Sequence, residues 1–199
     1  MKIATLGPTG TCSGEVASSY VADLGLHEDA LELCDTYEEA VQRVLAGTVD
    51  RVIVPAAYMN FHKIVFQNID QLKVSEILFS QTPTFVLAIK RGHLVDELDR
   101  TPRKVASHHA PSPLIDKLNL VTERVDASSN ARAAWMVSKG EADLCITQSK
   151  ALEAVNRVAT AEGQLEIVET FGPVDMIWAV FERGASARGF SYWRACLPK

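Results

Sequence analysis

The sequence lacks any excess of positive charge. Its 199 residues contain 20 lysines and arginines against 25 aspartates and glutamates, which gives a net charge of -5 at pH 7. The basic residues are also scattered along the chain. Proteins that bind nucleic acids usually gather lysine and arginine on one face. The composition therefore argues against a nucleic-acid partner, and an anionic ligand would need donors gathered locally.

Long apolar runs are absent as well. No run approaches the roughly 20 residues that a membrane-spanning helix needs. The N-terminus shows no basic region followed by an apolar one, which is the pattern of a secretion signal. We expect a cytoplasmic protein with no membrane association. With 47% hydrophobic residues, the chain can bury a substantial core as one domain or as two small lobes.

Cysteine and histidine are too dispersed to suggest a disulfide framework or a metal site. The four cysteines are Cys12, Cys34, Cys145 and Cys196, and they form no paired CxxC motif. Reduced thiols are therefore expected. The five histidines are His27, His62, His93, His108 and His109. Because adjacent residues of an extended chain point to opposite sides, His108 and His109 are not expected to share a metal ion.

The first informative pattern that is present is the turn 7–13. A short apolar strand, 3–6, runs into Gly7-Pro8-Thr9-Gly10-Thr11-Cys12-Ser13, and a helix-like segment, 15–24, follows. A helix start presents free backbone amides and the positive end of the helix dipole, which favour a small acidic ligand. The glycines permit close backbone approach or unusual dihedral angles, and Thr11 and Ser13 supply hydroxyls for capping or for a ligand.

The alternative for this turn is a plain tight turn with Ser13 as the helix N-cap. The spacing alone favours this alternative, because the run matches neither the phosphate-loop nor the dinucleotide-binding fingerprint.

Strand and helix patterns alternate along the rest of the chain. Strands are expected at 30–34, 51–54, 104–106, 122–125, 143–147, 165–170 and 176–181, and β-rich runs at 74–80 and 84–89 flank a crossover at Thr82-Pro83. Helices are expected from the capped start 35–39 to Gly47, and over 113–118, 129–139 and 150–158. This order predicts an α/β protein with mainly parallel sheets and ligand at the carboxyl ends of the strands. We expect two lobes, 1–81 with 171–199 and 82–170.

Polar loops follow strands at similar places in the two halves. In the second half these are Ser107 to Ser112 and Ser128 to Asn130. Helix starts in both lobes suit a ligand with two carboxylates. One exposed terminus contributes only about 0.3 to 1 kcal/mol, so several amides, hydroxyls and a cation must cooperate.

The side chains that would accompany these loops have ordinary alternatives. The cationic candidates are Lys63, His108 and Arg132, although a solvated surface position is the commoner state for residues such as Lys63 and Arg132. Tyr58 and Asn60 follow the strand that ends at Pro55. A half-buried tyrosine and a turn asparagine explain them equally well.

Taken in order, these motifs resemble the catalytic domain of prephenate dehydratases. The resemblance rests on the turn 7–13, Val54-Pro55, the strand 84–89, Ser107-His108 and Ser129-Asn130-Ala131, and it spans residues 2 to about 181. It implies a fold like that of type II periplasmic binding proteins, with two lobes around a prephenate cleft. It also leads us to expect no carboxyl-terminal regulatory domain and no phenylalanine feedback through one.

Two segments depart from the dehydratase pattern. Met176-Ile177-Trp178 stands where dehydratases carry a Thr-Arg-Phe run, and Ala56-Ala57-Tyr58-Met59 replaces Ile-Glu-Asn-Ser after Val54-Pro55. Together with the ending 181–184, these departures resemble the prephenate decarboxylases of bacilysin-type antibiotic pathways. The resemblance implies a carboxy-lyase that needs no cofactor and forms a dihydro-4-hydroxyphenylpyruvate.

Chemistry explains why the departures would change the product. Aromatisation of prephenate requires protonation of the departing C4 hydroxyl, and the side chains of Met176 and Ile177 have no proton to give. Decarboxylation can still proceed if a ring carbon is protonated. An apolar wall of Met176, Ile177 and Trp178 would also disfavour the ring carboxylate relative to the more diffuse charge of the transition state.

The resemblance implies a set of site residues. The predicted catalytic residues are His108, Tyr58 and Met176, and the predicted substrate-binding residues are Thr11, Cys12, Ser13, Tyr58, Thr82, Ser107, His108, Ser129, Asn130 and Ala131. His108 and Tyr58 are the titratable candidates for protonating the ring, and bound water is an equal alternative. Cys12 is interpreted as a small loop thiol and not as a nucleophile.

Three questions stay open at this point. A prephenate dehydratase with an altered late strand and a non-catalytic binding protein are the alternative functions, since two-lobed folds serve both purposes. The sequence does not decide whether the chain forms a homodimer. The aromatic residues Phe190, Tyr192 and Trp193 are expected to pack on a lobe or a partner.

Overall fold

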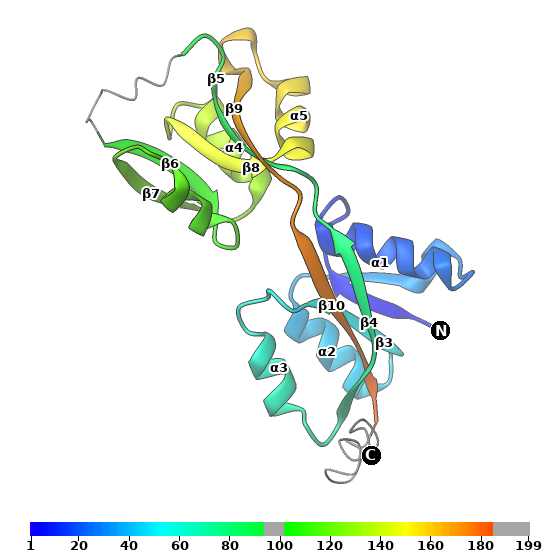
Figure 1. The fold of residues 1–199 in the computed structure, drawn as a ribbon. Helices are drawn as coiled ribbons and strands as arrows, with labels where there is room; N and C mark the ends of the chain where they lie inside the picture. The colour runs from blue at the N-terminus through cyan, green and yellow to red at the C-terminus, as the bar shows by residue number, and fades with distance from the viewer. Residues whose placement is uncertain (94–101, 185–199) are drawn as a thin grey trace, which may run out of the picture. The chain divides into compact units, whose positions relative to one another are not determined.

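The computed structural model describes residues 1–93 and 102–184. Within them the chain forms two compact units and passes from one to the other twice (Figure 1). The first unit comprises Met1–Ser80 and the described residues from Asp175 onward, and the second comprises Gln81–Val174. Each unit contains one five-stranded sheet with helices packed on its faces.

The sheet of the first unit has the strand order β2-β1-β3-β10-β4. Its strands are β1 (Ile3–Leu6), β2 (Leu31–Cys34), β3 (Arg51–Pro55), β4 (Leu72–Gln81) and β10 (Asp175–Arg183). β1 pairs in parallel with β2 and β3, whereas β10 runs antiparallel to β3. The carboxyl ends of β1, β2 and β3 therefore share one edge with the beginning of β10.

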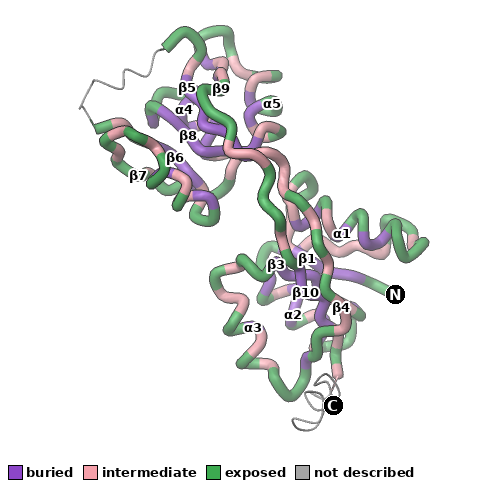
Figure 2. Tube along the Cα trace, in the orientation of Figure 1, coloured by how far each residue is buried: buried purple, intermediate pink, exposed green. Residues whose placement is uncertain are grey.

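Both faces of this sheet are covered. The helices are α1 (Cys12–Asp23), α2 (Tyr37–Ala46) and α3 (Phe61–Gln67), with a 3-10 turn at Glu28–Ala30. Alternate strand residues point to opposite faces, so Ile53 and Trp178 pack with α1, whereas Val54 and Ala179 pack with α2 and α3. Figure 2 shows buried residues in the inner strands of this sheet and in parts of α1, whereas β4 is largely intermediate or exposed.

The second unit repeats this plan with the strand order β7-β6-β8-β5-β9. Its strands are β5 (Phe85–Lys90), β6 (Arg103–His108), β7 (Thr122–Ala127), β8 (Leu144–Gln148) and β9 (Leu165–Gly172). β6 is parallel to β7 and β8, and β5 is antiparallel to β8 and β9. The carboxyl ends of β6, β7 and β8 therefore share one edge.

The helices of the second unit pack mainly on one face of its sheet. α4 (Asn130–Ser138) and α5 (Ser149–Val158) cover Val86, Ala106 and Cys145. A 3-10 helix, Ser112–Lys117, covers the other face through Ile115. A second 3-10 turn, Ala161–Gly163, precedes β9.

The predicted α/β class is confirmed, but the sheets are mixed. In each unit three parallel strands continue into an antiparallel neighbour, β10 in one case and β5 in the other. β5 follows the point where the chain enters the second unit, and β10 follows the point where it leaves. Parallel neighbours need a crossover connection, usually a helix, and neither strand is reached from its neighbour by one.

Several local expectations need correction. Helix α1 begins at Cys12, and its N-cap is Thr11, whose Oγ1 accepts a hydrogen bond from the Gly14 amide over 3.1 Å. Ser13 lies inside the first turn, so the alternative in which it caps the helix is wrong. The segment expected as a helix at 113–118 is a 3-10 helix, and α3 was not predicted.

Further expectations concerned the aromatic residues near the C-terminus, membrane-spanning helices and metal sites. Phe190, Tyr192, Trp193 and Cys196 lie outside the described ranges. Among residues 1–93 and 102–184, no helix combines the length and apolar character needed to cross a bilayer. Within the same ranges, no three His, Cys, Asp or Glu side chains gather as a metal site.

Candidate functional site

The predicted site residues fall into two groups, one at the carboxyl edge of each sheet. In the first unit the turn 7–13 follows β1, the start of α2 follows β2, and Ala56 to Asn60 follow β3. In the second unit Ser107 and His108 lie at the end of β6, and Ser129 and Asn130 follow β7. Loops at this edge are the usual place for ligands in α/β sheets.

The turn 7–13 depends on both of its glycines. A Cβ on Gly7 would lie 3.0 Å from Leu33 Cβ, so this position requires close approach to β2. Gly10 has a φ of 86°, which side-chain-bearing residues rarely adopt. Gly7 thus permits the close backbone approach, and Gly10 the unusual dihedral angle, that the sequence left as alternatives. Together they place Thr11 at the start of α1.

Ser13 is bound by a residue that the sequence did not single out. Its Oγ lies 2.5 Å from the hydroxyl oxygen of Tyr37, the first residue of α2. The Tyr37 side chain is only 4% exposed. Burial raises the pKa of this phenol, so it is protonated at neutral pH.

Tyr58 lies against the same tyrosine. The ring centroids of Tyr37 and Tyr58 are 4.7 Å apart with an interplanar angle of 56°. The Tyr58 hydroxyl donates to the Glu38 carboxylate over 2.8 Å and accepts from the Asn60 side-chain amide over 3.4 Å. Burial and the Glu38 carboxylate raise the pKa of Tyr58, with Asn60 opposing them. Tyr58 is therefore a neutral, oriented hydroxyl.

The two segments that depart from the dehydratase pattern are neighbours in the first unit. The Ala56 amide donates to the carbonyl oxygen of Ile177 over 2.8 Å, and Trp178 is opposite Pro55 in the β3–β10 pairing. The start of β10 therefore borders the loop that carries Tyr58. Because they are adjacent, a change in one segment alters the surroundings of the other.

The predicted apolar wall of Met176, Ile177 and Trp178 is wrong as a single surface. Met176 and Trp178 pack with α1 and with Cys12, and Trp178 is buried, with its Nε1 donating to Ser80 Oγ over 2.8 Å. Ile177 is 49% exposed and points to the opposite face, since strand side chains alternate. Met176, half-buried, is the member of this run on the same side as Cys12.

In the second unit Ser107 and His108 end β6. Ser107 is buried, and its Oγ donates to the carbonyl oxygen of His108 over 2.9 Å. The Nδ1 atom of His108 accepts from the Ala110 amide over 3.4 Å. Burial lowers the pKa of His108, and the neighbouring His109 lowers it further. His108 is therefore neutral at pH 7 and acts as an acid only under more acidic conditions.

The start of α4 lies at the same edge of this sheet. Ser129 is the N-cap, and its Oγ accepts from the Arg132 amide over 3.0 Å. The carbonyl oxygen of Asn130 accepts from Thr147 Oγ1 over 2.8 Å, which ties the helix start to β8. Within the described residues, Asn130 Oδ1 is a buried oxygen without a hydrogen-bond partner. It is thus an acceptor available to a donor from outside the protein.

The remaining candidates are less suited to contact a substrate. Thr82 lies where the chain enters the second unit, and it binds Val174, where the chain leaves that unit. Its Oγ1 donates to the Pro83 carbonyl oxygen over 2.9 Å and accepts from the Val174 amide over 3.0 Å. Ala131 is exposed in the first turn of α4. Of the cationic candidates, Arg132 pairs with Glu141 over 2.6 Å, and Lys63 is exposed on α3.

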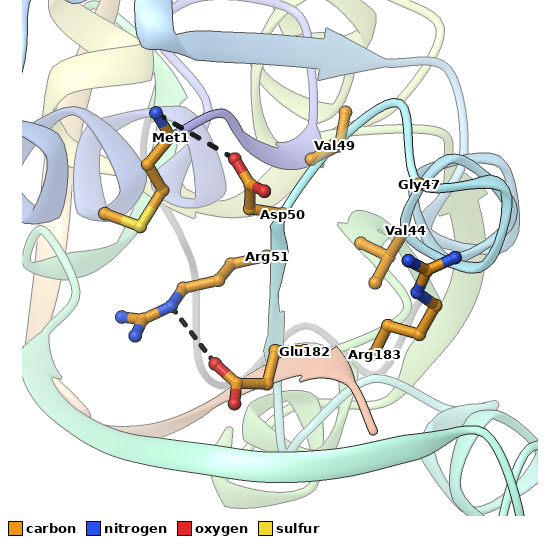
Figure 3. Close-up of a pocket in the computed structure, with 8 residues that line it drawn as sticks. All are labelled: Met1, Val44, Gly47, Val49, Asp50, Arg51, Glu182 and Arg183. Atoms are coloured by element: carbon orange, nitrogen blue, oxygen red, sulfur yellow. Dashed lines mark ion pairs between the residues drawn. The ribbon is translucent and has the colours of Figure 1, made fainter. Parts of the chain in front are cut away.

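A cavity of about 510 Å³ lies at the other edge of the first sheet (Figure 3). It is lined by Met1, Val44, Gly47, Val49, Asp50, Arg51, Glu182 and Arg183, at the beginning of β3 and the end of β10. Its charges are largely paired, since Arg51 binds Glu76 over 2.5 Å and lies 3.5 Å from Glu182. None of the predicted site residues lines this cavity.

The chain is similar in sequence to curated prephenate decarboxylases. It is 29% identical to the prephenate decarboxylase of Bacillus subtilis over 188 residues, which cover 92% of this chain and 86% of that protein. It is 28% identical to the one from Planktothrix agardhii over 191 residues, covering 91% and 87%. The resemblance to prephenate decarboxylases is confirmed. No protein-family model matches the chain.

Solved structures show the same fold. The prephenate dehydratase of Arthrobacter aurescens superposes with a TM-score of 0.58 and 19% identity, and the match covers 93% of this chain but 61% of that one. The periplasmic VFT2 domain of Bordetella pertussis BvgS gives 0.57 and 18%, covering 92% and 80%. The predicted class, a two-lobed fold like that of type II periplasmic binding proteins, is thereby confirmed. At these identities the likeness concerns the fold alone.

Sequence reasoning missed Tyr37 and Glu38, which bind the candidate residues Ser13 and Tyr58. They lie in the stretch 35–39, where the pattern indicated only a helix start. A signal was nonetheless present. Since β1, β2 and β3 are parallel, the segment after β2 must reach the same edge as the turn 7–13 and Tyr58.

Proposed function

We propose that this protein decarboxylates prephenate without aromatising it. The supporting observation is that Met176-Ile177 and the loop with Tyr58 adjoin at the carboxyl edge of the first sheet. Neither Met176 nor Ile177 can protonate a departing hydroxyl. The similarity to relatives named prephenate decarboxylase over about nine tenths of the chain supports the same reaction.

In this reaction the bond between the ring and its carboxylate breaks and carbon dioxide leaves. The electron pair moves through the ring diene, and a ring carbon takes up one proton. The C4 hydroxyl stays in place, so the product is a dihydro-4-hydroxyphenylpyruvate. At neutral pH the proton comes from Tyr58 or a bound water, and His108 can supply it only under more acidic conditions. The reaction has no net oxidation that would call for a redox cofactor.

The residues proposed to bind the substrate are Thr11 and Ser13 in the first unit, and Ser107, His108, Ser129 and Asn130 in the second unit. Asn130 Oδ1, as a buried acceptor, suits the C4 hydroxyl, which can donate to it. Retaining that hydroxyl is what distinguishes this product from phenylpyruvate.

We propose that the protein serves antibiotic-type natural product biosynthesis, because it resembles the prephenate decarboxylases of bacilysin-type antibiotic pathways. A dihydro acid that keeps its hydroxyl also differs from the phenylpyruvate from which phenylalanine is made. We also propose that the protein works in the cytoplasm. Cys34 and Cys145 form no disulfide, which suits a reducing compartment.

Incubation of the purified chain with prephenate tests the proposal. We expect carbon dioxide release and a product whose mass retains the hydroxyl and whose ultraviolet spectrum lacks the aromatic enol of phenylpyruvate. Phenylpyruvate as the main product would instead establish the dehydratase alternative. Prephenate that stays intact while its binding saturates would establish the binding-protein alternative.

A further inference from the structure

Tyr37 is a buried residue that contacts two of the proposed site residues at once. Its hydroxyl oxygen is 2.5 Å from Ser13 Oγ, and its ring lies 4.7 Å from that of Tyr58. It belongs to neither of the loops that carry those residues, since it is the first residue of α2. A single side chain therefore links the start of α1 to the loop after β3.

Either hydroxyl can be the donor of this hydrogen bond. A phenol is a stronger acid than an aliphatic alcohol, which favours Tyr37 as the donor and Ser13 Oγ as the acceptor. Within the described residues, this is the one hydrogen bond recorded for the Ser13 hydroxyl. The Ser13 proton is consequently left available for another acceptor.

The surroundings of Ser13 make an anion the natural acceptor. Ser13 lies in the first turn of α1, where backbone amides and the helix dipole favour negative charge. The Tyr37 ring is held in place by the core around Val41 and Val54. The donor to Ser13 is thus rigid before any ligand arrives.

We infer that Tyr37 is a positioning residue that orients the Ser13 hydroxyl toward a carboxylate of the substrate. Tyr37 does not itself touch the substrate, and it acts through Ser13. The inference rests on the proposed function. Its specific consequence is that the contributions of Tyr37 and Ser13 to substrate binding are not independent.

A double-mutant cycle with prephenate tests this. We expect Tyr37→Phe to raise KM by about 3- to 10-fold, because one oriented hydrogen bond is lost, with kcat within about 2-fold of wild type. Ser13→Ala is expected to raise KM by about 10-fold or more, since it removes a hydrogen bond to a charged group. Combining the two should raise KM no further than Ser13→Ala alone.

Tyr20→Phe is the matched control. Tyr20 is also a buried tyrosine of the first unit, and its hydroxyl accepts a hydrogen bond from Arg51, away from the carboxyl edge. We expect this variant to leave KM unchanged. Ser13→Cys probes the same hydrogen bond from the other side, and Tyr37→Phe should have no added effect on KM in that background either.

The outcomes separate this inference from the proposed function. Wild-type protein that neither converts nor binds prephenate would overturn both. Wild-type turnover with a KM for Tyr37→Phe equal to that of Tyr20→Phe would overturn the inference alone. The inference would also be overturned if the fold-increase in KM of the double variant equalled the product of the fold-increases in Tyr37→Phe and Ser13→Ala. Independent contributions of the two side chains would give that product.

Discussion

The amide of Ala56 and the carbonyl oxygen of Ile177 form a hydrogen bond of 2.8 Å that joins two segments 121 positions apart in the sequence. These are the two segments in which the chain departs from the dehydratase pattern. The bond holds the start of β10 against the loop that carries Tyr58. The residues that would decide the reaction therefore lie side by side within the first unit.

Restoring a donor at the start of β10 should partly restore aromatisation. We expect the variant Met176→Thr with Ile177→Arg to form some phenylpyruvate from prephenate, because a hydroxyl and a guanidinium can assist departure of the C4 hydroxyl. Product analysis by mass and ultraviolet spectrum measures this. Ile77→Arg, at another exposed isoleucine of the same sheet, is the control and should give none. An active, folded double variant with no phenylpyruvate would contradict the account.

Acidification should destabilise the protein through His108. Burial lowers the pKa of His108 in the folded chain below its ordinary value of 6.5, so the unfolded chain binds more protons there. Its contribution to stability is therefore present above pH 6.5 and is lost as the pH falls through the lowered pKa. We expect the unfolding free energy of His108→Gln, measured with urea, to fall less than that of wild type between pH 7.5 and pH 5.

The exposed His62 provides the comparison for this measurement. His62→Gln should follow the pH dependence of wild type. If His108→Gln and wild type lose the same unfolding free energy over this range, the neutral, buried state assigned to His108 is wrong.

Alanine variants of Gly10 and Gly25 distinguish backbone strain, which both should show, from an effect on prephenate binding, which only Gly10→Ala should show. Both have positive φ, 86° and 67°, and a Cβ at either meets no atom within 4 Å. Alanine at each should lower the unfolding free energy by about 1 to 2 kcal/mol, because the left-handed conformation disfavours a side chain. KM for prephenate should rise only in Gly10→Ala, since Gly10 shapes the turn before Thr11. Equal KM values for the two variants would remove the turn from the binding site.

The Trp178 indole should contribute to stability rather than to the choice of product. Trp178→Phe loses the bond to Ser80 and leaves a void in a buried site. We expect a loss of about 2 to 4 kcal/mol of unfolding free energy by urea titration, with the dihydro acid still the sole product. Ser80→Ala removes the same bond without the void and should cost less. Phenylpyruvate from Trp178→Phe would mean that Trp178 takes part in the choice of product.

Much of the architecture could be predicted because its signals are local. Helix α2 is capped by Thr36 and ends at Gly47, and both form hydrogen bonds with residues only three or four positions away. Ser129 and Gly140 mark α4 in the same way. α3 was not predicted, because Asn60 makes no side-chain cap bond and the helix has only seven residues. Its stability comes from packing of Ile64 on the core.

The sequence by itself determined the α/β class, most strands and helices, and the resemblance to prephenate decarboxylases, because each rests on residue order and short-range spacing. Only the tertiary structure decided that Ser13 binds Tyr37 and that Ala56 adjoins Ile177. These relations depend on which strands become neighbours. Strand pairing joins segments far apart in the chain, and it is selected by burial of the whole core, which no local pattern records.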